Sequence, residues 1–214
     1  MENISTLTSL KQLYLVNNKI NKITEEIGNL KNLKLIELGA NRIRVIENID
    51  NLINLESMWI GRNKITNINN LNNLTNLRIL SLQANRITVI ENLEGLINLE
   101  ELYLSENGIT VIANLDKLNK LKILDLSFNK IKKLENMKTL NLVEFWGNNN
   151  LIDNFEEIEG IKHMNNLNTL FLDGNLIAKN VQYRNKLIAM LPSVTCIDSI
   201  DVVHSSLTDI PQKQ

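Results

Sequence analysis

A repeat of about twenty-two residues runs along almost the whole chain and restricts its possible folds more than any other feature. The segment LRILSLQANRI, residues 77–87, fits the pattern LxxLxLxxNxI at every fixed position. Aligning the chain on the asparagine of this pattern gives eight copies, separated by 21 to 25 residues. These residues, called the frame asparagines below, are Asn18, Asn41, Asn63, Asn85, Asn107, Asn129, Asn150 and Asn175. Such a period is typical of solenoids, in which each unit packs only on its neighbours.

Each unit begins with a short segment in which apolar residues alternate with other residues, as in Leu102 and Leu104. A period of two predicts a strand whose apolar side chains point inward. The frame asparagine follows the strand, where its amide can bond turn backbone, and stacked copies would form a ladder between coils. The second half of the unit is apolar at every third position, as in Ile87, Ile90 and Leu93, which favours 3-10 or irregular turns over an α-helix.

Strands on one side and turns on the other predict an α/β solenoid, a right-handed leucine-rich-repeat superhelix with a concave parallel β-sheet and convex 3-10 or irregular turns. We expect residues 1–177 to form an array of about eight repeats, truncated at the N-terminus because no amphipathic cap precedes the first coil. Residues 178–198 are predicted to form a C-terminal cap with a helix, and residues 199–214 a flexible tail. The helical stripe expected in this cap consists of Val181, Leu187, Ile188 and Leu191.

Gly147 stands where the other repeats carry an aliphatic core residue. Its missing side chain would leave core volume unfilled, and an unfilled core volume is destabilising. We therefore expect a large neighbour, Phe145, Leu151 or Phe155, to fill the space.

The composition argues against several classes of function. Lys and Arg (23) nearly balance Asp and Glu (24), so net charge gives no reason to expect nucleic acid or a membrane as partner. The N-terminus has no secretory signal and no stretch is long and apolar enough to span a membrane, which predicts an intracellular protein of the nucleus and/or cytoplasm.

Residues able to carry out chemistry are few. The histidines His163 and His204 lie far apart and the single cysteine, Cys196, adjoins the apolar cap, so none has the spacing of a metal ligand set. We predict a protein that is not an enzyme, with no catalytic residues, metal site or cofactor.

The central residue of each predicted strand points outward, and together these residues form one row across the sheet. This central row consists of Tyr14, Glu37, Trp59, Ser81, Tyr103, Asp125, Trp146 and Phe171. Five of its eight members are aromatic, in a chain with nine aromatic residues (two Trp, three Tyr and four Phe). Exposed aromatic residues gathered in this way indicate a protein interface. The general preference of aromatic residues for strands is the alternative explanation, and it accounts poorly for five in one row.

Charge is distributed unevenly between the predicted surfaces. Glu101, Glu144 and Asp173 add negative charge beside the central row. The residue after the frame asparagine is basic in five repeats, at Lys19, Arg42, Lys64, Arg86 and Lys130. An acidic concave face would attract a basic protein surface, although a merely solvated charged surface is the simpler alternative.

Several segments together identify a family resemblance. The unit NxIxxIxxLxxL, the block LEELYLSENGITVIANL, the segment EFWGNNNLI and the closing YRNKLIAMLPSVTCID closely resemble the leucine-rich-repeat regulatory subunit of protein phosphatase 1, from about Leu10 to Asp198. The resemblance implies a non-catalytic, regulatory or inhibitory subunit that binds the phosphatase catalytic subunit through its concave face. A third regulatory protein is a further candidate partner, which the residues do not specify. The resemblance also implies contacts at Tyr14, Glu37, Trp59, Asp125, Glu144, Trp146 and Phe171, with Tyr103 in the same row.

Two other hypotheses remain open from the residues. The chain could be an adhesion protein of the secreted bacterial leucine-rich-repeat type, whose units follow a similar pattern. It could also be a scaffold in a ribonucleoprotein or cytoskeletal assembly, with a different partner on the same concave surface.

Overall fold

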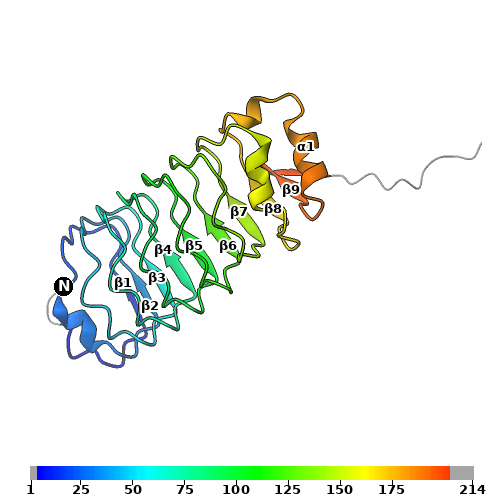
Figure 1. Cartoon of the computed structure of the whole chain (residues 1–214). Helices are drawn as coiled ribbons and strands as arrows, with labels where there is room; N and C mark the ends of the chain where they lie inside the picture. Colours follow the sequence, from blue (N-terminus) through cyan, green and yellow to red (C-terminus); the bar gives the residue numbers. More distant parts are fainter. Residues whose placement is uncertain (1–3, 203–214) are drawn as a thin grey trace, which may run out of the picture.

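The computed structural model describes residues 4–202 and shows a solenoid whose strands stack along one side (Figure 1). Its ten-stranded sheet follows the order of the chain; β1 to β9 are parallel, and β10 closes the sheet antiparallel to β9. The outward surface of this sheet is called the sheet face below, and it corresponds to the predicted concave face. The strands are β1 (Gln12–Tyr14), β2 (Leu35–Glu37), β3 (Ser57–Trp59), β4 (Ile79–Ser81), β5 (Glu101–Tyr103), β6 (Ile123–Asp125), β7 (Glu144–Trp146), β8 (Thr169–Phe171), β9 (Cys196–Ile197) and β10 (Ile200–Asp201). The predicted leucine-rich-repeat solenoid is confirmed.

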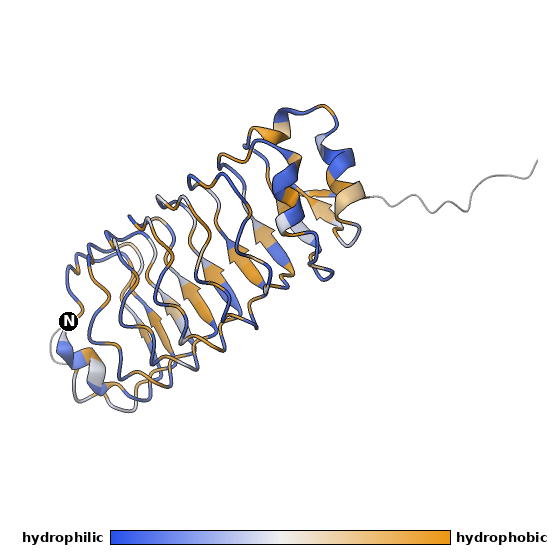
Figure 2. Cartoon of the chain, viewed as in Figure 1, coloured by the Kyte–Doolittle hydropathy of each residue, from blue (hydrophilic) through white to orange (hydrophobic). Residues whose placement is uncertain are grey.

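The core is a continuous stack of aliphatic side chains. The middle residue of each strand from β2 to β8 is buried, as Met58 is in β3, while its neighbours lie on the sheet face. Apolar residues recur in every coil (Figure 2), and those at every third position, such as Ile65, Ile68 and Leu71, are fully buried. Burying one Leu or Ile stabilises a fold by roughly 1.5–3 kcal/mol, so the repeated pattern itself drives stacking.

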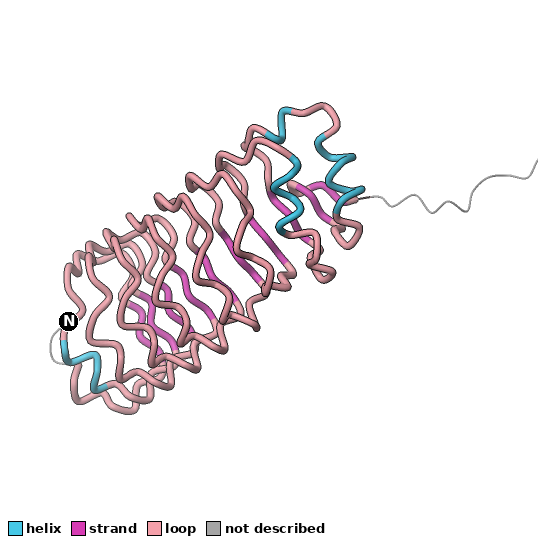
Figure 3. Tube along the Cα trace, viewed as in Figure 1, coloured by secondary structure: helices cyan, strands magenta, loops and turns pink. Residues whose placement is uncertain are grey.

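The outer side of the central coils consists of turns, and helices occur only towards the two ends of the described chain (Figure 3). Successive tight turns follow the three-residue pattern, since Leu74 N donates to Leu71 O and Leu77 N to Leu74 O, both at 2.9 Å. The 3-10 helices are η1 (Glu25–Asn29), η2 (Phe155–Gly160) and η3 (Ile177–Lys179). The predicted 3-10 or irregular outer side is therefore confirmed.

The frame asparagines form the predicted ladder. In a typical coil, Asn63 Oδ1 accepts Ile43 N of the preceding coil at 2.9 Å, and Asn63 Nδ2 donates to Leu38 O of that coil at 3.0 Å. The same Nδ2 also donates to Ile60 O and Gly61 O within its own coil. Each side chain thus satisfies backbone groups that the turn would otherwise leave unpaired.

Two further asparagine ladders were not predicted. One consists of asparagines with positive φ on the outer turns, Asn48, Asn70, Asn92, Asn114 and Asn136, whose Nδ2 atoms donate to carbonyls of the preceding coil at 2.7–2.8 Å. The other, before the strands, consists of Asn32, Asn54, Asn76 and Asn98 and donates in the same direction at 2.8–2.9 Å. In both ladders, the bonds that the asparagine Nδ2 atoms donate between coils all reach the coil before.

The gap left by Gly147 is filled from within its own strand. Phe145 is fully buried, and a Cβ placed on Gly147 would lie 3.0 Å from the Phe145 ring. Leu151 remains 43% exposed, so the suggestion that it fills the core was wrong, and Phe155 is only partly buried. Phe145 and Gly147 therefore form a matched large-and-small pair.

The C-terminal end contains the single α-helix of the described chain, α1 (Tyr183–Met190). Val181, predicted to belong to its apolar stripe, is fully exposed because it precedes the helix, whereas Tyr183 is buried and donates to Asp198 at 2.8 Å. Strand β10 lies within the predicted tail, so the boundary after Asp198 was placed too early. The rest of that tail, 203–214, lies outside the described residues. No helix in the described range is long and apolar enough to cross a membrane.

Candidate protein-binding surface

The central row exists as predicted, because the parallel strands pair in strict register. Trp59 is the partner of Ser81, and Ser81 of Tyr103, and the same correspondence links every adjacent pair from Tyr14 to Phe171. Adjacent parallel strands lie about 4.8 Å apart, so alternate members of the row are separated by roughly 10 Å at the backbone.

Four rings of the row touch one another across these strands. Trp59 and Tyr103 stack with centroids 5.9 Å apart and planes at 25°. Tyr103 meets Trp146 edge-on at 6.3 Å, and Trp146 meets Phe171 edge-on at 5.9 Å. Offset and edge-on pairs at these separations are the favoured arrangements of aromatic rings. These four residues are called the aromatic ladder below.

Small residues beneath the rings allow the ladder to form. Ser81 lies between Trp59 and Tyr103 and is 1% exposed, and Asp125 lies between Tyr103 and Trp146 and is 4% exposed. The Asp125 carboxylate accepts Ser127 N at 2.9 Å. Asp125 thus supports the rings from below and offers little surface of its own; its contact with a protein stays a prediction.

A hollow of about 260 Å³ opens at the Trp146 end of the aromatic ladder. It is lined by Asp125, Ser127, Trp146, Asn148 and Phe171. The Nε1 of Trp146 is buried and has no hydrogen-bond partner within residues 4–202. A buried donor without an acceptor is unfavourable, and a ligand could satisfy this one only if the Trp146 ring moved to expose the nitrogen.

The sheet face carries acidic groups close to the rings. Glu101 accepts the Tyr103 hydroxyl at 2.7 Å, and burial, together with this carboxylate, raises the pKa of Tyr103 well above its usual value. Glu144 begins β7 and is half-buried. At the end of the sheet, burial and the charge of Asp198 raise the pKa of Asp173. The local potential of the face is therefore negative, which favours a basic partner.

One predicted contact residue, Tyr14, lies apart from the aromatic ladder, whereas Glu37 is the direct strand partner of Trp59. Tyr14 is 57% exposed and bonds only Gln12, at 3.3 Å. Glu37 separates it from Trp59 in the row. The structure thus brings Trp59, Tyr103, Trp146 and Phe171 together, while Tyr14 stands alone on the first strand.

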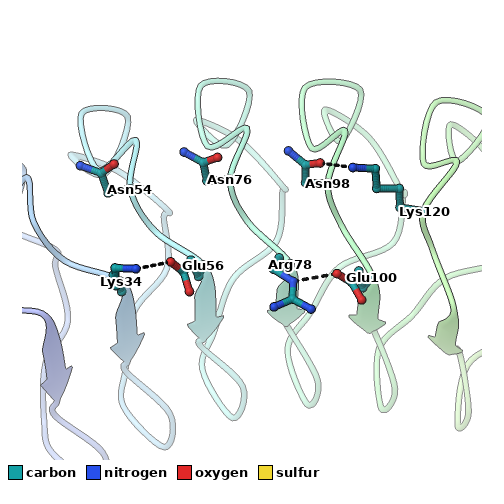
Figure 4. A pocket seen from close by; sticks show the side chains of 8 residues that line it. All are labelled: Lys34, Asn54, Glu56, Asn76, Arg78, Asn98, Glu100 and Lys120. Atoms are coloured by element: carbon teal, nitrogen blue, oxygen red, sulfur yellow. Dashed lines mark hydrogen bonds and ion pairs between the residues drawn. The ribbon is translucent and has the colours of Figure 1, made fainter.

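The upstream edge of the sheet, formed by residues just before the strands, is polar (Figure 4). Charges alternate there from coil to coil: Lys34 pairs with Glu56 at 2.6 Å, and Glu100 pairs with both Arg78 and Lys122 at 2.7 Å. The pKa of Glu100 is lowered to about 2, mainly by the hydrogen bond from Arg78 and next by the hydrogen bond from Lys122.

A hollow of about 510 Å³ lies along this edge. Its Lys34, Glu56, Arg78 and Glu100 side chains are already in ion pairs, so few unpaired charges remain to bind a ligand. Sequence analysis missed these pairs, although the alternation of sign at one repeat position was visible in the printed chain.

Within the described residues, no group of three or more His, Cys, Asp or Glu side chains is placed to hold a metal ion. His163 Nε2 lies 3.0 Å from Leu140 O, a contact between coils, and Cys196 is half-buried in β9.

Comparison with known proteins places the chain among repeat proteins. The profile described as "Leucine Rich repeats (2 copies)" matches residues 97–138, and that described as "Leucine Rich Repeat" matches residues 9–30. Among solved structures, the Leptospira interrogans LRR protein LIC12759 is 31% identical with a TM-score of 0.79, covering 90% of this chain and 50% of that one. Internalin C2 of Listeria monocytogenes is 26% identical with a TM-score of 0.79, covering 90% of this chain and 82% of that one.

Two curated relatives carry names that describe a function. The protein phosphatase 1 regulatory inhibitor subunit PPP1R7 homolog of Arabidopsis thaliana is 51% identical over 47 residues, 22% of this chain and 14% of the relative. The protein phosphatase 1 regulatory subunit SDS22 of Schizosaccharomyces pombe is 43% identical over 69 residues, 31% of this chain and 21% of the relative. The matches thus span about a fifth or less of each relative. Together with the repeats and the solenoid, they show that the chain is a leucine-rich-repeat protein related to the SDS22-type regulatory subunits of protein phosphatase 1.

Proposed function

We propose that this chain is a non-catalytic regulatory subunit that binds the catalytic subunit of protein phosphatase 1 through its sheet face and restrains its activity. The observation that carries the proposal is the aromatic ladder, an ordered set of rings on the sheet of a chain related to such subunits. Aromatic residues commonly dominate the energy of protein interfaces.

The rigidity of the ladder supports binding. Each ring stands on a strand held by parallel pairing on both sides, and neighbouring rings restrict one another. Side chains that are already ordered lose little conformational entropy on docking, so more of the contact energy appears as affinity.

Electrostatics narrows the kind of surface that would dock. Glu101, Glu144 and Asp173 flank the ladder, and Glu37 lies in the row itself. A partner region with Lys or Arg around apolar residues would complement this face and would be steered towards it. We therefore assign the eight predicted contacts, from Tyr14 to Phe171, to a basic region of the phosphatase.

Three further parts of the proposal concern a third regulatory protein, the C-terminal cap and the cellular location. Docking on the sheet face leaves the outer turns free for a third regulatory protein. Residues 178–198 would act as a cap that holds the Phe171 end of the row, and an intracellular site, in the nucleus and/or cytoplasm, would bring the chain to its phosphatase partner.

The test is direct binding between the purified full chain and the purified phosphatase catalytic subunit, measured by biolayer interferometry. The Glu144→Ala, Trp146→Ala double variant is expected to weaken binding at least about tenfold, because it removes a central ring and an acidic group together. A phosphatase assay on a phosphopeptide, run in parallel, should show inhibition by the unmodified chain and much less by the variant.

The matched control is the Glu94→Ala, Ile97→Ala double variant. Both residues are exposed on the outer turns, so the change also removes one carboxylate and one apolar side chain. Its affinity should stay within about twofold of the unmodified chain, as expected away from an interface. Equal binding by all three proteins would refute the sheet-face assignment, and absence of binding by the unmodified chain would favour the scaffold hypothesis.

A further inference from the structure

A second charged surface lies along the downstream edge of the sheet, where the chain leaves each strand. Segments 17–22, 40–45, 62–67 and 84–89 occupy equivalent places in four successive coils and contain seven Lys or Arg residues and no Asp or Glu. This set, called the cationic stripe below, consists of Lys19, Lys22, Arg42, Arg44, Arg62, Lys64 and Arg86. In the next coil, Glu106 and Gly108 interrupt it.

The charges of the stripe are not neutralised within the described part of the chain. Six of its side chains are exposed and Lys64 is half-buried, and none takes part in an ion pair there. The upstream edge behaves differently, because its cations Lys34, Arg78 and Lys122 all have carboxylate partners. Like charges one coil apart repel one another, so the stripe is an arrangement that a negatively charged ligand would stabilise.

Backbone geometry fixes the spacing of the stripe. Arg42 N donates to Ile20 O, Lys64 N to Ile43 O and Arg86 N to Ile65 O, each at 2.8 Å. These bonds hold equivalent residues of adjacent coils in register. Four coils at about 4.8 Å place the first and last cations about 14 Å apart at the backbone, the length of four or five residues of extended peptide.

The stripe continues into a hollow on the sheet face. A pocket of about 180 Å³ is lined by Glu37, Gly39, Trp59, Gly61 and Arg62, among others. Arg62 therefore borders both the stripe and the first ring of the aromatic ladder. A segment lying along the stripe could seat one apolar side chain in this hollow.

We infer that the cationic stripe is a docking site for an extended, Asp/Glu-rich segment of a partner protein. Carboxylates spaced along an extended chain match a straight row of cations, and arginine can bond a carboxylate through two N–H groups. A nucleic-acid duplex fits less well, because its second line of phosphates would lie over the adjoining sheet face and meet Glu37, whereas a single extended peptide can stay on the stripe. The inference concerns a surface outside the central row and stands independently of the proposed function.

The test uses the full chain and a fluorescein-labelled peptide of about eight glutamates, long enough to span the stripe. Binding is followed by fluorescence anisotropy at low salt and should weaken as salt screens the charges. The Arg42→Glu, Lys64→Glu, Arg86→Glu variant should lose at least about tenfold in affinity. The affinity of the corresponding triple glutamine variant should lie between those of the unmodified chain and the triple glutamate variant. Thermal unfolding followed by circular dichroism should show that both variants are folded.

The matched control is the Lys31→Glu, Lys117→Glu, Lys138→Glu variant, which makes the same change in net charge at exposed lysines outside the stripe. It should retain affinity within about twofold if the site is local. Equal loss in both triple variants, or no binding of the glutamate peptide at all, would overturn the inference. Tighter binding of an oligothymidylate of equal charge would also overturn it, since the stripe would then be a nucleic-acid site.

Discussion

The rings of Trp59 and Tyr103 stack at 5.9 Å although a complete repeat separates their strands. Contact at this range requires both side chains to lean over the intervening strand, and that is possible because the residue between them is Ser81, a small side chain covered by the rings. From Trp59 to Trp146 the row therefore alternates large and small residues on successive coils, and at its end Phe171 directly follows Trp146.

Tyr103 is the most informative single position in the aromatic ladder, because it contacts rings on both sides. Tyr103→Ala should lower phosphatase affinity at least about tenfold, and loss of two ring pairs should cost about 1–3 kcal/mol of folding free energy. Isothermal titration calorimetry and urea unfolding measure the two effects. Tyr14→Ala, at an exposed site outside the ladder, is the control for folding stability, which it should change little. An equal loss of folding free energy in both variants would argue against the ladder.

The frame asparagine Asn129 is predicted to be essential for coil stacking. Asn129→Leu leaves Ile109 N of the preceding coil without its acceptor, and a buried unsatisfied group costs about 1–3 kcal/mol. Leu104 O loses the bond from Asn129 but keeps the one from Asn107. The urea midpoint should fall markedly. Asn18→Leu is the matched control, because Asn18 is exposed and bonds only carbonyls of its own coil; a similar fall there would contradict the ladder's role between coils.

Phe145 and Gly147 should behave as a coupled pair. Phe145→Leu alone opens a cavity, and Gly147→Leu alone collides with the Phe145 ring, so each should cost about 1–4 kcal/mol. The double variant restores the leucines that β5 and its turn carry at Leu102 and Leu104, and it should recover much of the loss. A double-mutant cycle from urea unfolding measures the coupling, and simple additivity would show that the two sites are independent.

Acid should weaken the upstream edge through Glu100. Its pKa is depressed in the folded state from 4.5 to about 2, so the ion pairs contribute full stability above pH 4.5 and lose it as the pH falls towards 2. Because both pairs are partly exposed, the contribution is about 1 kcal/mol or less for each. Glu100→Gln should be less stable than the unmodified chain at neutral pH, with a difference that shrinks below pH 4.5; a constant difference in unfolding midpoints across this range would contradict the assignment.

The fold followed from the printed sequence because each repeat carries its own complete signal. The alternation in the strand and the frame asparagine recur eight times, and the three-residue spacing of the turn recurs in all but the last unit. An error in one repeat therefore has little effect on the predicted fold. The same redundancy placed the central row, since register in a parallel sheet is fixed once the repeats are aligned. Positions that occur once are harder to predict. Val181 precedes the helix whose apolar stripe it was expected to join, and of the three candidates to fill the Gly147 gap, Phe145 is buried whereas Leu151 is exposed.

Side-chain contacts between coils were the part that sequence patterns could not supply. The burial of Asp125 depends on how far Tyr103 and Trp146 lean, and no periodicity encodes a rotamer. The two additional asparagine ladders, in contrast, were predictable, because their regular spacing is visible in the sequence. The repeat was aligned on the frame asparagine alone, and this alignment does not draw attention to the other two positions.

The direction of the asparagine bonds has a consequence for how the protein is made. Asn63 fastens its coil to backbone groups that come earlier in the chain, as do Asn48 and Asn54 on the other sides of the coil. During synthesis, each newly emerged coil therefore arrives carrying the groups that attach it to the coil already finished, and it needs nothing from residues still to be translated for this attachment. The array can thus close progressively from its first coil onwards, in step with the ribosome.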